Sequence, residues 1–122
     1  MSTQRREQRK FHRVSFEQDV TLRWEGQSCS VKVQDLSLNG ARVAFRGPAP
    51  PAIGTQVTLY IPLTGRQEIT MTARVVHHDR NTLGLERVAI DLDSISHLRR
   101  VVANKLSDPG LLARDLAALE QS

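Results

Sequence analysis

Asp35-Leu36-Ser37-Leu38-Asn39-Gly40 joins two runs that are typical of β-strands, Ser30–Gln34 and Ala41–Phe45. An Asn-Gly pair between two such runs is a strong signal for a hairpin, because both central residues of a type I′ turn need a positive φ angle. We therefore expect a tight turn centred on Asn39 and Gly40, with paired strands on either side of it.

The same pattern of short strands and turn residues continues in both directions from this hairpin. Alternating apolar and polar residues, bounded by Gly, Pro, Asn and Asp, predict six strands. So many short strands leave the fewest exposed edges when the sheet closes on itself. We therefore predict a mainly β fold, a six-stranded antiparallel barrel, with its strands at residues 20–24, 28–34, 41–45, 56–61, 69–76 and 83–88.

The last thirty residues change to a helical period. Asp93 or Ser94 is available as the N-cap of a first helix, and Pro109 stands at the favoured first position of a second. We expect these C-terminal α-helices to cover an open end or a face of the barrel. Their apolar stripes consist of Ile95, Leu98, Val102 and Leu106 in the first helix, and Leu112, Leu116 and Leu119 in the second.

The net charge of +4 is concentrated at the N-terminus. The first 13 residues hold five of the 17 basic and one of the 13 acidic residues, so that residues 14–122 have 12 of each. The first ten residues show no apolar periodicity, which predicts a flexible basic N-terminal arm. A near-neutral body with a cationic arm suits a compact anionic ligand better than a nucleic acid polymer. We expect three parts: the arm (1–13), the barrel (14–91) and the helices packed on it (92–122).

Several classes of protein are disfavoured by what the sequence lacks. A single cysteine, Cys29, fits a reducing compartment. There is no apolar run near the roughly 18 residues of a membrane span and no secretory leader, so we expect a cytoplasmic protein that does not contact a membrane. No nucleophile elbow or Ser–His–Asp arrangement is recognisable, so we expect no enzyme. We also expect no metal site, because CxxC and HxxxH spacings are missing among Cys29, His12, His77, His78 and His97.

Four polar side chains suggest a ligand. Asp35 and Ser37 share one face of a strand, and a carboxylate can accept hydrogen bonds from both N1–H and N2–H₂ of guanine. Arg9 and Arg13 stand four residues apart where the arm meets the barrel. A guanidinium group pairs with phosphate or with guanine O6 and N7, and can stack on a base. Together these residues can address the phosphate and both polar edges of a guanine nucleotide.

The order of these motifs resembles a PilZ domain. Arg9-xxx-Arg13 leads into an apolar run, and Asp35-x-Ser37-x-x-Gly40 follows roughly twenty residues later on a six-stranded body. PilZ domains are known as receptors for cyclic di-GMP. The resemblance implies that the two arginines hold phosphates and guanine, that Asp35 and Ser37 read a guanine base, and that Gly40 permits the turn that presents them.

The resemblance spans nearly the whole chain and adds further candidates for ligand binding. The closing segment Ile90–Arg100 is similar to that of small single-domain members of the family. Arg5 forms an overlapping RxxxR motif with Arg9, although only the later copy leads directly into the apolar run. Arg6 also lies in the basic arm, and Lys10 stands where the family often has another arginine.

A histidine is the last candidate. His77 or His78 occupies the strand end where some relatives place a ring against the ligand. Adjacent residues of a strand point to opposite faces, so only one of the two can contribute.

The resemblance implies a cyclic di-GMP receptor that binds its ligand without turning it over. Ligand binding would lay the arm across the barrel and create a surface for a separate downstream protein. One alternative is a PilZ-like adaptor that acts through protein contacts alone, and the intact motif residues argue against it. A barrel that binds RNA or DNA is disfavoured by the neutral body and by the lack of aromatic residues for stacking on the strands.

Overall fold

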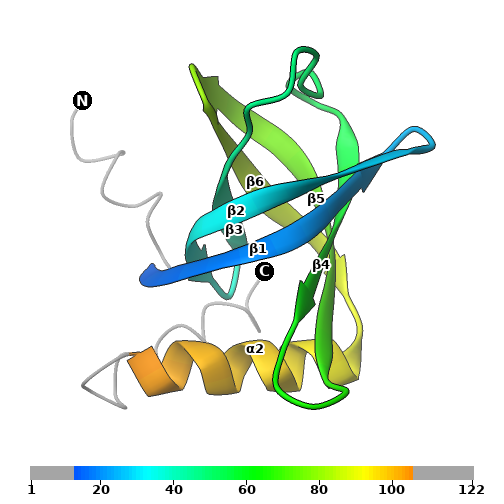
Figure 1. The fold of residues 1–122 in the computed structure, drawn as a ribbon. Helices are drawn as coiled ribbons and strands as arrows, with labels where there is room; N and C mark the ends of the chain where they lie inside the picture. The colour runs from blue at the N-terminus through cyan, green and yellow to red at the C-terminus, as the bar shows by residue number, and fades with distance from the viewer. Residues whose placement is uncertain (1–12, 106–122) are drawn as a thin grey trace, which may run out of the picture.

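A computed structural model describes residues 13–105 of the chain (Figure 1). The basic arm before Arg13 and the second helix expected at Pro109 lie outside the described residues. The described elements are β1 (Val14–Trp24), β2 (Gln27–Ser37), β3 (Gly40–Ala44), β4 (Gln56–Pro62), β5 (Glu68–Asp79), β6 (Thr82–Ile90) and α2 (Leu92–Lys105).

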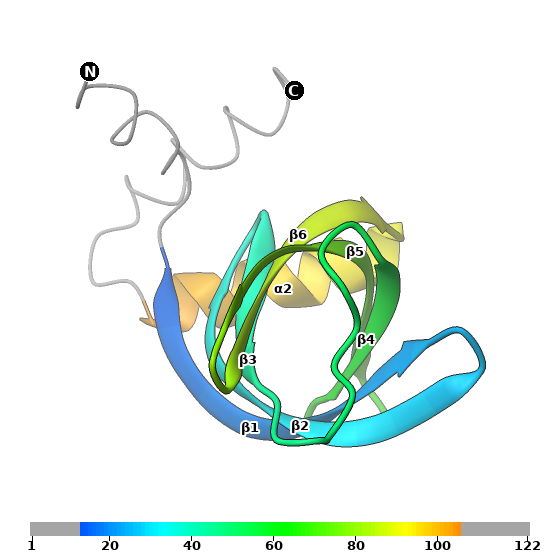
Figure 2. The same cartoon turned by 90° about the horizontal axis from the view of Figure 1, so that it is seen from above.

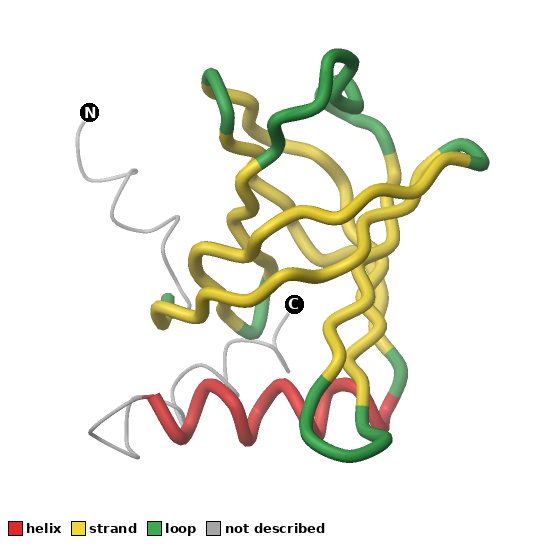
Figure 3. The backbone as a smooth tube through the Cα atoms, in the orientation of Figure 1, coloured by secondary structure: helices red, strands yellow, loops and turns green. Residues whose placement is uncertain are grey.

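The six strands close into an antiparallel barrel in the order β1-β2-β3-β6-β5-β4, which confirms the predicted architecture. Figure 2 looks into the ring of strands, with α2 behind it. β3 pairs with β6, so the β4–β5–β6 meander turns back to complete the wall. The last seam joins β1 to β4, where Leu22 lies opposite Leu59. The loops gather at the two ends of the barrel (Figure 3).

The barrel interior is filled mainly by aliphatic side chains that alternate with outward-facing polar residues along each strand, as the period-two patterns predict. At one end, Trp24 and Phe45 meet edge to face, with ring centroids 5.8 Å apart. At the other end, Leu98 and Val102 of α2 are fully buried. Burying a Val, Leu or Ile side chain contributes about 1.5–3 kcal/mol. The fully buried strand residues include Leu22, Val33, Leu36, Val43, Leu59, Ile61, Ile69, Met71 and Leu83.

The β1–β2 turn lies where the sequence predicts it, whereas the β2–β3 turn differs from the sequence-based expectation. The β1–β2 turn at Glu25 and Gly26 has φ angles of 49° and 80°, so this is where both central residues adopt the left-handed region. The prediction of a type I′ turn at Asn39 and Gly40 is wrong. Leu38 and Asn39 form the turn, and Gly40 already belongs to β3. Among the described residues, Glu25 and Arg80 are the only ones other than glycine with a positive φ.

The helix α2 begins two to three residues earlier than the expected N-caps would allow. Asp91 caps it: its Oδ2 accepts a 2.9 Å hydrogen bond from the backbone N–H of Ser94. The expectation of Asp93 or Ser94 as N-cap is therefore wrong. Ser94 instead lies buried, and its hydroxyl accepts a 2.9 Å hydrogen bond from the backbone N–H of Thr70 in β5. This bond ties the first turn of the helix to the barrel.

Within residues 13–105, α2 is the only helix, and it is too short and too polar to cross a bilayer.

The cap of α2 predicts a pH dependence of stability. Hydrogen bonds from the side chain and backbone N–H of Ser94 lower the pKa of Asp91 below its ordinary value of 3.8. The ionised cap therefore stabilises the fold fully above that value, and its contribution is lost as the pH falls through the lowered pKa. Asp91→Asn keeps a capping side chain that does not titrate. Thermal unfolding between pH 6 and pH 2 should show a smaller loss of stability on acidification for Asp91→Asn than for the wild type.

The matched control is Asp93→Asn, which removes a carboxylate from the first turn of the same helix but leaves the cap in place. Its pH profile should follow the wild type more closely than that of Asp91→Asn. If Asp91→Asn lost as much stability on acidification as the wild type, the cap would not contribute through its charge.

Candidate functional site

The β2–β3 hairpin presents two of the expected ligand-binding residues on the outside of the barrel. Asp35 lies opposite Arg42, and Ser37 lies opposite Gly40. Leu36, between Asp35 and Ser37, is fully buried in the core. Asp35 and Ser37 therefore share the opposite, outer face of β2, as the strand period predicts.

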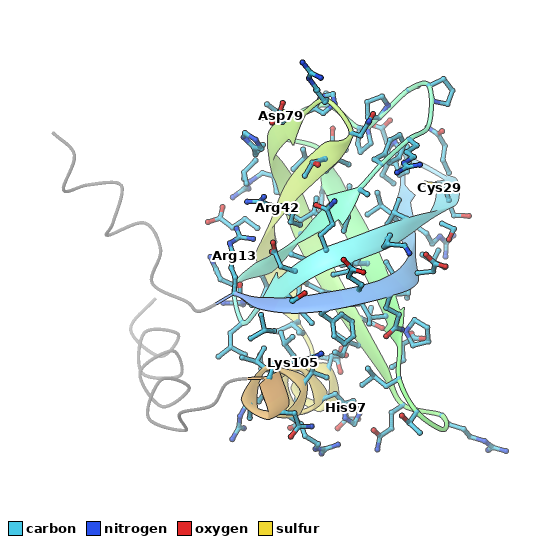
Figure 4. All side chains as sticks on the ribbon, turned by 60° about the vertical axis from the view of Figure 1, so that its left-hand side comes forward. Arg13, Cys29, Arg42, Asp79, His97 and Lys105 are labelled. Carbon is cyan, nitrogen blue, oxygen red and sulfur yellow. The ribbon has the colours of Figure 1, made fainter. Side chains whose placement is uncertain are left out.

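Asp35 is held between two arginines from the neighbouring strands. Arg13, which directly precedes β1, places its Nη1 atom 2.5 Å from Asp35 Oδ1. Arg42 on β3 places its Nε atom 3.7 Å from Oδ2. Figure 4 shows Arg13 and Arg42 on the same side of the barrel. The three side chains together carry one positive charge in excess and remain partly exposed, which gives a site suited to an anion.

Ser37 has a different position from Asp35, because only 6% of its surface is exposed. Its hydroxyl accepts a 3.2 Å hydrogen bond from the backbone N–H of Asn39 and lies 3.4 Å from the carbonyl oxygen of Gly40, to which it can donate. These bonds span the turn of the hairpin. In this structure Ser37 therefore stabilises the turn that follows Asp35.

Gly40 is required by the close approach of two strands. A Cβ atom at this position would overlap the carbonyl oxygen of Leu85 in β6 and lie 3.0 Å from its carbonyl carbon. The backbone of β3 can pass this close to β6 only without a side chain at Gly40. Its role is thus to seat the hairpin against β6, which differs from the expected role in a positive-φ turn.

Arg87 of β6, which no motif in the sequence indicates, fixes the same turn from the other side. Its Nε donates a 3.2 Å hydrogen bond to the carbonyl oxygen of Leu38, and its backbone N–H donates a 2.7 Å bond to that of Asn39. Arg87 is therefore a positioning residue for the hairpin.

A bulge decides between the two histidines. The β5–β6 register shifts between Val75 and His77, so that His77 pairs with Gly84 and His78 with Leu83. Leu83 is fully buried and points into the barrel. A Cβ atom at Gly84 would lie 2.9 Å from that of His77, so these two positions share the outer face. His77 is thus the histidine that lies on the face of Asp35 and Arg42.

The remaining candidates are not brought into this site. Arg5, Arg6, Arg9 and Lys10 lie outside the described residues. Cys29 stands on the same strand as Asp35 but near the opposite end, and burial raises the pKa of its thiol. Among residues 13–105, no three His, Cys, Asp or Glu side chains gather closely enough to hold a metal ion.

Away from Asp35, a groove of about 600 Å³ runs between β1, the β4–β5 loop and the end of α2. Its lining is mostly apolar, with Phe16, Leu63 and Val101 on its walls, and Lys105 is the one charged side chain that residues 13–105 contribute to it. The groove has neither the carboxylate nor the paired arginines of the Asp35 site, so it is the weaker candidate for an anionic ligand.

A protein-family model covers most of the chain. The model of the PilZ domain matches residues 7–104. This range includes Arg9, Arg13 and the whole of the Asp35–Gly40 hexapeptide.

Solved structures share the fold at low sequence identity. The PilZ domain of CeSA from a cellulose synthesizing bacterium is 22% identical, with a TM-score of 0.64 over 76% of this chain and 96% of that one. The Bacillus subtilis inhibitor of motility, MotI/DgrA, is 20% identical, with a TM-score of 0.64 over 80% of this chain and 52% of that one. The Borreliella burgdorferi PlzA protein, solved in complex with c-di-GMP, is 14% identical, with a TM-score of 0.59 over 80% of this chain and 42% of that one. This chain thus spans about half of MotI/DgrA and less of PlzA.

The contact between Gly40 and Leu85 predicts a large effect of a small substitution. Gly40→Ala forces β3 and β6 apart at the hairpin, and overpacking of this kind costs about 1–3 kcal/mol or more. Urea unfolding should show a greater loss of stability than for Gly26→Ala. Gly26 has open space around it, so that its substitution meets only the backbone strain of the left-handed region, about 1–2 kcal/mol. An equal or smaller loss for Gly40→Ala would show that the two strands can separate at little cost.

Proposed function

Since this chain belongs to the PilZ domain family, whose members bind cyclic di-GMP, we propose that it is itself a cyclic di-GMP receptor. The observation that carries this proposal is the outward-facing carboxylate of Asp35 between Arg13 and Arg42. In this proposal the receptor acts in the cytoplasm. Ligand binding changes its surface, and a separate downstream protein recognises the changed surface.

The chemistry of Asp35 supports guanine as the base. A carboxylate has about four lone-pair sites, and the two arginines approach one oxygen each. Sites therefore remain for hydrogen bonds from guanine N1–H and N2–H₂, while the arginines hold the carboxylate in place. Adenine has no N1–H and no 2-amino group, so it cannot make this pair of bonds.

The arginines provide the charge for the phosphates. Arg13 is fixed at the start of β1 by its ion pair with Asp35, and Arg9 stands four residues before it in the sequence. Each can pair bidentately with a phosphate or with guanine O6 and N7. The contact with Asp35 means that any ordering on ligand binding concerns the residues before Arg13, including Arg5, Arg6, Arg9 and Lys10.

We expect Arg9→Ala and Arg13→Ala each to weaken cyclic di-GMP binding by about 1–3 kcal/mol, roughly tenfold to a hundredfold. The melting temperature should change little, because exposed ion pairs contribute about 0–1 kcal/mol. Asp35→Ala should weaken binding and also reduce the preference for cyclic di-GMP over cyclic di-AMP. Calorimetric titration of the four proteins with both ligands measures these effects.

Arg23→Ala is the matched control, because Arg23 is an exposed arginine at the far end of β1. It should bind like the wild type. Equal affinity of the wild type for both dinucleotides would contradict base reading by Asp35, and no binding at all would favour the adaptor alternative.

Ligand binding should also protect the arm from proteolysis. Trypsin can cleave after Arg5, Arg6, Arg9, Lys10 and Arg13, and ordering of this segment across the barrel would slow cleavage. Digestion with and without saturating cyclic di-GMP, followed by mass spectrometry, should show protection at Arg9 and Lys10, whereas Arg13 is already held by Asp35 without the ligand. Cleavage after Arg99 and Arg100 in α2 is the internal control and should be unaffected. Unchanged cleavage of the arm in the liganded protein would place the conformational response elsewhere.

A further inference from the structure

The strand register places four positions in one line across the outside of the barrel. Asp35 on β2 pairs with Arg42 on β3, Arg42 pairs with Gly84 on β6, and Gly84 pairs with His77 on β5. The line runs perpendicular to the four strands. One end is Asp35, which is expected to read guanine, and the other is His77, which the bulge in β5 selects over His78 as the outward-facing histidine.

The ends of this line are too far apart for one base to touch both. Neighbouring strands lie about 4.8 Å apart, so three spacings separate Asp35 from His77 by about 14 Å along the surface. A ligand that contacts both residues must therefore pass over β3 and β6. The positions that it crosses are Arg42 and Gly84.

Both positions are suited to lie under a ligand. The Arg42 side chain is 46% exposed, and its Nε is held 3.7 Å from Asp35 Oδ2. Its terminal nitrogens carry further N–H donors in the plane of the guanidinium group. Gly84 has no side chain to stand above the sheet, so the surface stays low between Arg42 and His77.

We propose that Arg42 is a ligand-binding residue of this site. The absence of a side chain at Gly84 leaves room for the ligand to extend from Asp35 to His77. The inference rests on the proposed function and specifies it: the ligand is a dinucleotide, and Arg42 contacts the part that lies beyond the base held by Asp35. The Arg42 guanidinium donates to a phosphate or a base there while it also orients the Asp35 carboxylate.

The experiment compares cyclic di-GMP with GMP, which contains one base and one phosphate. Arg42→Ala should weaken binding of cyclic di-GMP by about tenfold to a hundredfold, the effect of losing a good bidentate contact. It should change the affinity for GMP, measured by NMR titration, much less. Arg42→Lys keeps the charge without the planar fork and should recover only part of the loss. Arg23→Ala is again the matched control.

Gly84 provides a second, independent readout. Gly84→Ala and Gly84→Leu should weaken cyclic di-GMP binding progressively, because the larger side chain occupies more of the space that the ligand needs. His77→Gly removes the Cβ atom that the new Cβ at Gly84 would meet. If the side chain at Gly84 blocks the ligand itself, the Gly84→Ala/His77→Gly double variant should bind more weakly than His77→Gly alone, whereas equal binding would show that Gly84→Ala acts only by displacing His77. The melting temperature of each variant shows whether the barrel is intact.

The outcomes separate this inference from the function on which it rests. If the wild type fails to bind cyclic di-GMP, the proposed function is wrong and the role of Arg42 is wrong with it. If the wild type binds and Asp35→Ala weakens binding, but Arg42→Ala binds normally, only the role of Arg42 is overturned. Equal losses for GMP and cyclic di-GMP in Arg42→Ala would also overturn it, because they would show that Arg42 acts only by orienting Asp35.

Discussion

The approach of Gly40 to the carbonyl group of Leu85 fixes where β3 meets β6, and the outer face of the barrel depends on this register. β3 has only five residues, yet it pairs with β2 on one side and with β6 on the other. With Gly40 seated opposite Glu86, Arg42 lies between Asp35 and Gly84. A slip of one residue would turn the side chains of β3 to the other face. Arg42 would then point into the core.

Much of the fold could be predicted from the sequence because each strand has one buried face. Period-two patterns such as that of Ile69–Val75 report directly which residues face the core. The turn of the β2–β3 hairpin was misplaced by one residue, and this error had a consequence for the site. A turn at Leu38 and Asn39 pairs Asp35 with Arg42, whereas the expected turn at Asn39 and Gly40 pairs Asp35 with Ala44. The observed register therefore brings Arg42 beside Asp35, a pairing that the expected turn does not predict.

Other features depend on contacts between segments that are distant in the sequence. A strictly alternating β5, with Val75 inside, would turn His77 inward and His78 outward, but the bulge after Val75 places His77 beside Gly84. Arg87 supports a turn 49 residues away through a side-chain bond. Neither a bulge nor such a bond leaves a periodic signal in the residues themselves. The sequence also does not show which motif residues contact the ligand and which support the fold. For Ser37, the hydrogen bonds to Asn39 and Gly40 show that it stabilises the turn.

The long β1–β2 hairpin offers a place to insert a reporter far from the candidate site. Its turn at Glu25 and Gly26 projects from the barrel (Figure 1), while Asp35 lies on the same hairpin nine residues after Gly26, about 31 Å away along β2 at about 3.4 Å per residue. A fluorescent reporter inserted between Glu25 and Gly26 would be joined to the site by the paired strands β1 and β2, whose register shifts once, between Ser15 and Gln18. It would still be too distant to obstruct the site. The hairpin tip is therefore a rational insertion point for turning this small barrel into an optical sensor.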